Sequence, residues 1–212
     1  MLKENAFIGS SLIRMYSSCG CLMEAHNVLD TSQAQDVVMW TSMIGGYCMH
    51  EYHTKAFECF EQMQAKGFSP NVVTFISILK ACAHAGAMER IEEIVMKIEI
   101  KGWLEKEFFL GCALIDMYVK CMSLEESRFI FNELVCRDLI SWSIMISGYA
   151  NSGQISLALQ LFVDMQQEGK MPNNVIFVCI IKLCPSVDMV KLIHSQIVEG
   201  GFEPDIVITN VS

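Results

Sequence analysis

The chain has 212 residues, 52% of them hydrophobic and only four of them proline, which provides ample material for a folded core and excludes a disordered tail. Its longest unbroken apolar stretch, Val175 to Ile181, is far short of the ~20 residues that cross a membrane, so no membrane partner is expected. The formal net charge of -9 opposes long-range attraction to nucleic acid.

The predicted elements come in pairs of helices along the chain. One clear pair covers Val37 to His50 and Thr54 to Lys66, where apolar residues recur at helical spacing. Gly67 and Pro70 follow the second segment, as a glycine and then a proline commonly follow the end of a helix. Such a hairpin cannot bury both of its faces alone, so we expect neighbouring hairpins to stack.

The same pattern returns later in the chain. Shifted by 102 residues, the sequence matches itself at many positions, among them Trp40 with Trp142 and Pro70 with Pro172. Units of 31, 35 and 36 residues make up this period. The sequence therefore predicts an all-α protein, a right-handed α-solenoid of tandem helix-turn-helix repeats that forms a single array over residues 1–212.

The ten cysteines do not form a metal or disulfide pattern. No CxxC pair occurs, and Cys19 with Cys21 and Cys179 with Cys184 lack a second ligand pair. We expect free thiols that behave as small hydrophobes in a reducing compartment, with no metal and no cofactor. A nucleophile elbow, a phosphate-binding loop and a dinucleotide fingerprint are missing, so neither an enzyme nor a small-molecule substrate is predicted.

Residues 37–71 resemble a pentatricopeptide repeat. The resemblance rests on the Val-Val-x-Trp start, the Gly-Tyr at the end of the first helix, and the closing Ala-x-x-x-Phe-x-x-Met-x-x-x-Gly-x-x-Pro-Asn. The alternating lengths are similar to the short, standard and long motifs of one plant subclass. Tetratricopeptide repeats are less similar, because their fixed period and their Trp-x-x-Leu-Gly-x-x-Tyr pattern are missing.

This resemblance divides the chain into successive motifs. Their bounds are 6–36, 37–71, 72–107, 108–138, 139–173, 174–205 and 206–212. The motif at 174–205 is degenerate, since residues are missing between Cys184 and His194 and Pro185 would end or kink a helix. The motif at 206–212 is truncated, and residues 1–5 resemble the tail of an earlier one. The chain thus resembles a fragment or a truncated relative of a longer array.

The resemblance implies that each repeat binds one base of single-stranded RNA through its fifth and last residues. The candidate base-reading residues are Ser10, Asp36, Thr41, Asn71, Cys112, Asp138, Ser143, Asn173 and Asn210. Carried over, the first pair implies guanine, and the Thr-Asn and Ser-Asn pairs imply adenine. Cys112 departs from the usual hydroxyl or amide, and Ile76 and Val178 cannot hydrogen-bond. The implied target is G-A-x-x-A, read 5′ to 3′.

Two further sets of residues follow from the resemblance. The second residue of each motif would wedge against the bases, and these residues are Phe7, Val38, Val73, Phe109, Ile140 and Val175. The thirteenth residue often contacts phosphate in the family, and here only Lys120 is cationic at that position. From the residues alone, apolar side chains near helix starts indicate packing, and small polar ones indicate helix caps.

The implied function is the recognition part of an RNA editing or processing factor in mitochondria or plastids, with other such factors as partners. No targeting sequence is expected within this chain. The deaminase motifs His-x-Glu and Pro-Cys-x-x-Cys are also absent. Two alternatives remain open. The acidic, apolar groove of a repeat array also fits a protein-interaction scaffold without RNA binding, and a truncated array fits a protein without independent activity.

Overall fold

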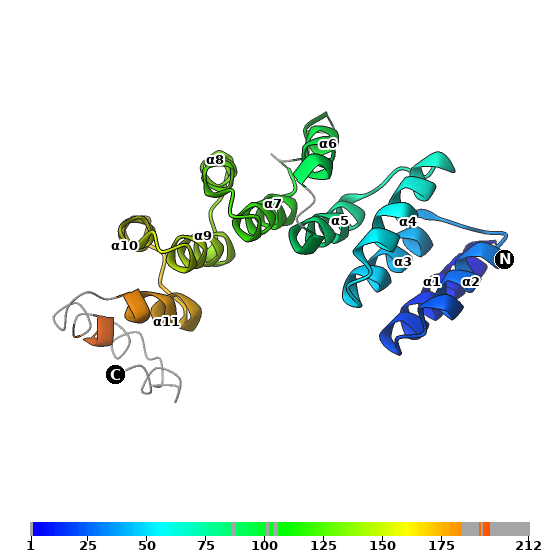
Figure 1. Cartoon of the computed structure of the whole chain (residues 1–212), viewed down its shortest axis with the longest axis horizontal. Helices are drawn as coiled ribbons and strands as arrows, with labels where there is room; N and C mark the ends of the chain where they lie inside the picture. The colour runs from blue at the N-terminus through cyan, green and yellow to red at the C-terminus, as the bar shows by residue number, and fades with distance from the viewer. Residues whose placement is uncertain are drawn as a thin grey trace. The chain divides into compact units, whose positions relative to one another are not determined.

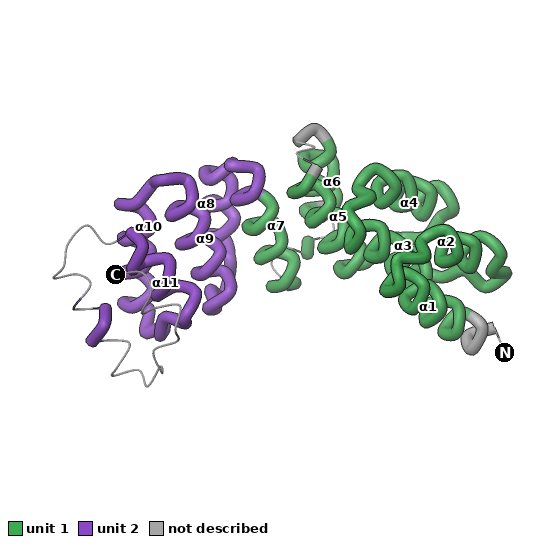
Figure 2. Tube along the Cα trace, turned by 60° about the horizontal axis from the view of Figure 1, so that its bottom comes forward, with its two compact units in different colours: residues 1–117 green, residues 118–212 purple. Residues whose placement is uncertain are grey.

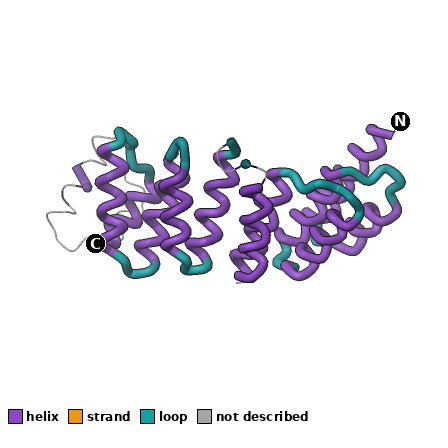
Figure 3. Tube along the Cα trace, turned by 90° about the horizontal axis from the view of Figure 1, so that it is seen from above, coloured by secondary structure: helices purple, strands orange, loops and turns teal. Residues whose placement is uncertain are grey.

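The structure is a computed structural model that describes residues 2–85, 88–100, 102–103, 106–183, 191 and 193–195. Within these residues the regular elements are helices, and no strand is present (Figure 3). The helices labelled in Figure 1 are α1 (Leu2–Ser18), α2 (Leu22–Thr31), α3 (Val37–Met49), α4 (His53–Ala65), α5 (Val72–Ala85), α6 (Met88–Ile100), α7 (Phe108–Lys120), α8 (Leu124–Glu133), α9 (Leu139–Asn151), α10 (Ile155–Gln167) and α11 (Asn174–Leu183).

The helices fall into two compact units, residues 1–117 and residues 118–212 (Figure 2). The boundary lies inside α7, so α1 to α6 and most of α7 belong to the first unit. The end of α7 and the helices α8 to α11 belong to the second. Each unit is described by itself below, and the single array over the whole chain stays a prediction.

The predicted motif boundaries coincide with the starts of the first helices. The helices α3, α5, α7, α9 and α11 begin at the first residue of their motifs. The second helix of the pair analysed above, α4, covers His53–Ala65 and so begins and ends one residue earlier than predicted. The helix α1 begins at Leu2, so residues 2–5 are helical; that residues 1–5 belong to an earlier motif stays a prediction.

The core of the first unit lies around α3, which packs against α1, α4 and α5 (Figure 1). Trp40, Met43 and Ile44 of α3 are fully buried there. The stacking is close at two glycines. A side chain at Gly9 would meet the Met39 side chain of α3, and one at Gly46 would meet the Ser17 side chain of α1. Helices of neighbouring motifs therefore approach one another through positions without a side chain.

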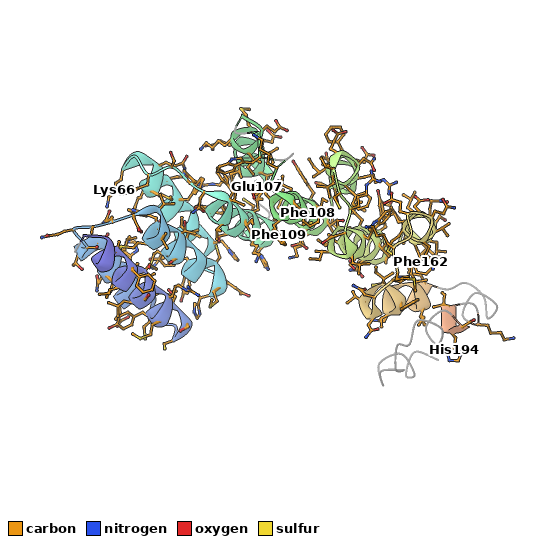
Figure 4. The ribbon with its side chains drawn as sticks, turned by 180° about the vertical axis from the view of Figure 1, so that it is seen from behind. Lys66, Glu107, Phe108, Phe109, Phe162 and His194 are labelled. Atoms are coloured by element: carbon orange, nitrogen blue, oxygen red, sulfur yellow. The ribbon has the colours of Figure 1, made fainter. Side chains whose placement is uncertain are left out.

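The second unit repeats this arrangement around α9, which packs against α8, α10 and α11. The Phe131 and Trp142 rings meet edge to face with centroids 4.8 Å apart. Phe162 of α10, labelled in Figure 4, meets Phe177 of α11 in the same way at 6.5 Å. Each aromatic pair joins the second helix of one motif to the first helix of the next, as the stacking of hairpins requires.

The structure also bears on the predictions for the cysteines, for membrane-spanning helices and for metal ligands. The described cysteines are free, as expected, but Cys19, Cys21 and Cys136 are exposed and are not small buried hydrophobes. No helix in the described part of the chain has the length and apolar character to cross a bilayer. Among those same residues, no cluster of three or more His, Cys, Asp or Glu side chains is suited to a metal ion. Pro185 and Asn210 lie outside the described residues.

Candidate nucleic-acid interface

The last residue of four motifs caps the helix that follows it. The Asp36 carboxylate accepts a hydrogen bond from the Met39 backbone N–H at 2.9 Å, and that of Asp138 accepts from Ile140 and Ser141. Asn71 Oδ1 accepts from the Thr74 N–H at 2.9 Å. Asn173 Oδ1 accepts from Ile176 at 3.0 Å. Capping satisfies helix N–H groups and fixes where these side chains stand.

The fifth-residue hydroxyls lie one turn into the same first helices. Ser10 Oγ donates to the Phe7 carbonyl at 3.0 Å, and Ser143 Oγ donates to the Leu139 carbonyl at 2.6 Å. Thr41 Oγ1 instead lies 2.7 Å from Thr74 Oγ1 of the next motif. Where the hydroxyl proton is held by the protein, the oxygen lone pairs remain to accept a bond from a ligand.

The second residues of the motifs point away from the core. All six predicted wedge residues are at least half exposed, from 50% for Ile140 to 73% for Phe7. Phe109 (Figure 4) is the aromatic member of this set in α7, and it is 66% exposed. Packing between hairpins therefore does not account for these side chains, which leaves their apolar surfaces free for a ligand.

Two hollows in the first unit gather the predicted residues motif by motif. One hollow of about 640 Å³ is lined by Phe7, Ser10, Asp36 and Val38, together with the linker before α3. These are the second, fifth and last residues of the first motif and the second residue of the next. Its volume falls in the range of ~300–1,000 Å³ that is typical of ligand sites.

The second hollow is lined by residues at the same motif positions, one motif further along the chain. It measures about 730 Å³, and its lining includes Val38, Thr41, Asn71 and Val73. Val38 thus lines both hollows, as an apolar side chain between two adjacent bases would. The predicted residues of the first two motifs are therefore brought together in space in the order in which the resemblance places them.

In the second unit the corresponding polar pair is in direct contact. Asn173 Nδ2 donates to Ser143 Oγ at 3.2 Å, while Ile140 and Val175 on either side are exposed. The pair at Cys112 and Asp138 differs, because Cys112 is only 5% exposed and the two residues belong to different units. Ser10 is similarly buried at 6%, although it lines a hollow. Lys120 is exposed at the end of α7.

The sequence analysis missed a cation at the second hollow. Arg14, the ninth residue of the first motif, is exposed and lines this hollow beside Thr41 and Asn71. The fifth and ninth residues of a helix lie on one face, one turn apart. Lys80 and Lys182 occupy the same ninth position and are also exposed. The signal was present in the sequence as cations at the ninth residue of three motifs, in addition to Lys120 at the thirteenth residue.

A thiol beside this surface remains uncharged. Cys48 Sγ donates to the carbonyl of Ser77 at 3.3 Å, and Ser77 lines the second hollow. Burial raises the pKa of Cys48 to about 11, so it carries no negative charge at neutral pH. The hollow therefore lacks a thiolate that would repel phosphate.

These features define a helical repeat protein in which, within the first unit, α1 and α3 present corresponding polar and apolar side chains to two hollows. Two family models match it. One, described as PPR repeat family, covers residues 35–84 and 137–185, and another, described as PPR repeat, covers residues 10–33 and 112–139. Together they match more than half of the chain, which therefore belongs to the pentatricopeptide repeat family. The matched residues therefore consist of repeats and not of an enzyme domain.

The chain is similar to parts of longer plant proteins. Pentatricopeptide repeat-containing protein At2g33680 of Arabidopsis thaliana is 37% identical over 94% of this chain and 26% of the relative. Pentatricopeptide repeat-containing protein At4g18520, chloroplastic, of the same plant is 34% identical over 92% of this chain and 31% of the relative. The chain thus spans between 26% and 31% of the length of these two relatives.

A solved structure supports the fold. The crystal structure of the pentatricopeptide repeat protein PPR10 in complex with an 18-nt psaJ RNA element matches with a TM-score of 0.78. The match covers 97% of this chain and 32% of that one at 20% identity. A second structure, PPR10 from maize, matches with a TM-score of 0.71 at 17% identity. The predicted α-solenoid fold is confirmed by this likeness.

Proposed function

We propose that the chain binds single-stranded RNA, with one base in each hollow, and that it selects the sequence G-A-x-x-A. The observation that carries the proposal is the pair of hollows in the first unit. Each is lined by the second, fifth and last residues of one motif and the second residue of the next. The family likeness to PPR10, whose structure contains an RNA element, supports the same ligand class.

The polar residues match different Watson-Crick edges. A carboxylate only accepts hydrogen bonds, so Asp36 suits guanine, which offers two adjacent N–H donors on that edge. An amide such as Asn71 also donates, which suits the unprotonated ring nitrogen of adenine. Apolar side chains on both sides hold the base by its faces, a contact of roughly 1–3 kcal/mol per base for aromatic platforms.

We further propose the cellular role that the resemblance implies. The chain would act in mitochondria or plastids as the recognition part of an RNA editing or processing factor, together with other such factors. Two similar relatives are named as chloroplastic, At4g18520 and At1g08070. With few readable repeats and a net charge of -9, binding by this chain alone is expected to be weak and dependent on low salt.

The test is a titration of the chain against labelled G-A-N-N-A and scrambled oligonucleotides at low salt. The proposal predicts tighter binding to G-A-N-N-A, and equal affinity for both would reject sequence selection. Val38→Asp should abolish most of the binding, because Val38 lines both hollows. Met96→Asp is the matched control, since Met96 is equally exposed on the second helix α6.

One observation favours a second candidate function. The net charge of -9 suits a protein-interaction scaffold better than an RNA-binding surface. A scaffold would retain its protein partner after nuclease treatment and would bind neither oligonucleotide. The same titration therefore separates the two candidates.

A further inference from the structure

Thr74 is a buried residue that belongs to neither base-reading position, yet its hydroxyl joins two residues that do. Its side chain is fully buried at the start of α5. Thr74 Oγ1 donates to Asn71 Oδ1 at 2.9 Å and lies 2.7 Å from Thr41 Oγ1. It also accepts from the Asn71 backbone N–H at 3.2 Å. Thr74 Oγ1 thus connects Thr41, the fifth residue of the second motif, with Asn71, the last residue of that motif.

The hydrogen bonds fix where each proton lies. The Thr74 hydroxyl has a single proton, which is committed to Asn71 Oδ1. In the contact between the two threonines, Thr41 must therefore be the donor and Thr74 the acceptor. The amide of Asn71 is fixed as well, because the atom that accepts from the backbone N–H of Thr74 has to be the oxygen.

The consequence is a fixed pattern on the side of the hollow. The Thr41 hydroxyl donates its hydrogen bond to Thr74 Oγ1, so the Thr41 oxygen can only accept a hydrogen bond from a ligand. The oxygen of Asn71 already receives two bonds, so Asn71 presents its NH₂ group as a donor. One acceptor beside one donor matches a base with an exocyclic amine next to an unprotonated ring nitrogen. Adenine and cytosine have that edge, whereas guanine and uracil have a carbonyl next to a ring N–H.

The sites of the first and fifth motifs lack this connection. The position of Thr74 is occupied by Met39 after the first motif and by Ile176 after the fifth, and neither has a hydroxyl. In the second unit one of the two Asn173 Nδ2 protons is donated to Ser143 Oγ, and the Ser143 hydroxyl donates to the Leu139 carbonyl. At the Cys112–Asp138 pair the equivalent residue is Ser141, whose hydroxyl donates to the Asp138 backbone carbonyl. Among the described sites, the link between a fifth and a last residue through a third hydroxyl is a property of the Thr41–Asn71 site.

We infer that Thr74 is a positioning residue that determines specificity at the second base, by making this hollow select an amino base over a keto base. The inference rests on the proposed RNA binding. Without the hydroxyl, Thr41 regains a free proton that it can donate to a carbonyl, and Asn71 loses one of the two bonds that orient its amide. Guanine then becomes acceptable where adenine was preferred.

The test compares adenine with guanine at the second base of the G-A-N-N-A oligonucleotide, for the intact chain and for three variants of Thr74. The intact chain is expected to prefer adenine by about tenfold, as a well-placed pair of base contacts provides. Thr74→Val keeps the shape without the hydroxyl and should reduce this ratio to about twofold or less. Thr74→Ser keeps the hydroxyl and should keep the roughly tenfold preference for adenine. A merely structural role of Thr74 would not make the preference depend on the hydroxyl.

The first base and the fold serve as controls. All variants should keep the preference for guanine at the first base, where Thr74 has no part, and a thermal melt of each shows whether it folds. Thr74→Ala is measured in parallel, so that the loss of the hydroxyl is tested even where valine perturbs packing. Unchanged adenine preference in folded Thr74→Val and Thr74→Ala overturns this inference alone. No base preference in the intact chain overturns the proposed function itself.

Discussion

At the scale of single residues, the last residue of a motif has two roles that share one side chain. Asp36 and Asn71 each use an oxygen to cap the next helix, and both line a hollow. The sequence left capping and base reading as competing interpretations. The structure shows that they are compatible, because capping consumes one side-chain atom and directs the rest of the group toward the hollow.

Arg14 is predicted to contact a phosphate, because it lines the second hollow and is exposed. Arg14→Gln should weaken binding to every oligonucleotide alike, without changing which base is preferred. The dependence of log affinity on log salt should become shallower by about 0.7, the value for one phosphate on a single strand. Lys55→Gln, which removes a charge from the second helix α4, should leave the slope unchanged; an equal effect of both variants would assign Arg14 no local role.

The thiols are predicted to react in order of exposure. Burial raises the pKa of Cys48 to about 11 and that of Cys59 to about 12, so both stay protonated well above neutral pH. At pH 8 only about one Cys48 in a thousand is the reactive thiolate. Iodoacetamide labelling followed by peptide mass spectrometry should find Cys19 and Cys21 modified before Cys48 and Cys59. Equal rates in the native protein would contradict the burial of α3 and α4.

At the scale of elements, two adjacent glycines of α3 test how closely the hairpins stack. A Cβ at Gly46 would lie 2.8 Å from the Ser17 Cβ of α1, whereas a Cβ at Gly45 meets nothing within 4 Å. Gly46→Ala should lower the free energy of unfolding by about 1–3 kcal/mol through overpacking. Gly45→Ala should raise it by about 0.5–1 kcal/mol, since alanine favours the helix.

Thermal and urea unfolding of the two glycine variants measures both changes. A shift of roughly 2–4 °C per kcal/mol is expected for a chain of this size. If Gly46→Ala were as stable as Gly45→Ala, the close approach of α1 and α3 would be wrong.

The sequence predicted the hairpins better than their connections. The starts of α3, α5, α7, α9 and α11 followed from the repeat period, because each motif begins at a helix. The second residues of the motifs are exposed, and some of them line the hollows, while their contact with bases stays a prediction. The bond between Thr74 and Thr41 was not predicted, because it joins residues of different motifs and depends on how the hairpins stack.

At the scale of the whole molecule, the net negative charge of the chain disfavours the predicted ligand, because RNA is also negatively charged. A net charge of -9 repels a polyanion at distances within the Debye length of about 10 Å at 0.1 M salt. Local cations at the ninth positions, Arg14, Lys80 and Lys182, offset this repulsion on the first helices. The two matched relatives are about three to four times as long, and a longer row of hollows would add affinity base by base.

The most direct test of base reading by the last residue of a motif is a substitution that changes one side-chain group of Asn71. Asn71→Asp replaces the amide NH₂ by a second oxygen and keeps the cap, because aspartate and asparagine cap equally well. Oligonucleotide titrations should show that the preference for adenine at the second base is lost, because aspartate has no N–H to donate to the ring nitrogen, while the first base remains guanine. An Asn71→Asp variant that folds and still prefers adenine would contradict base reading by the last residue of each motif.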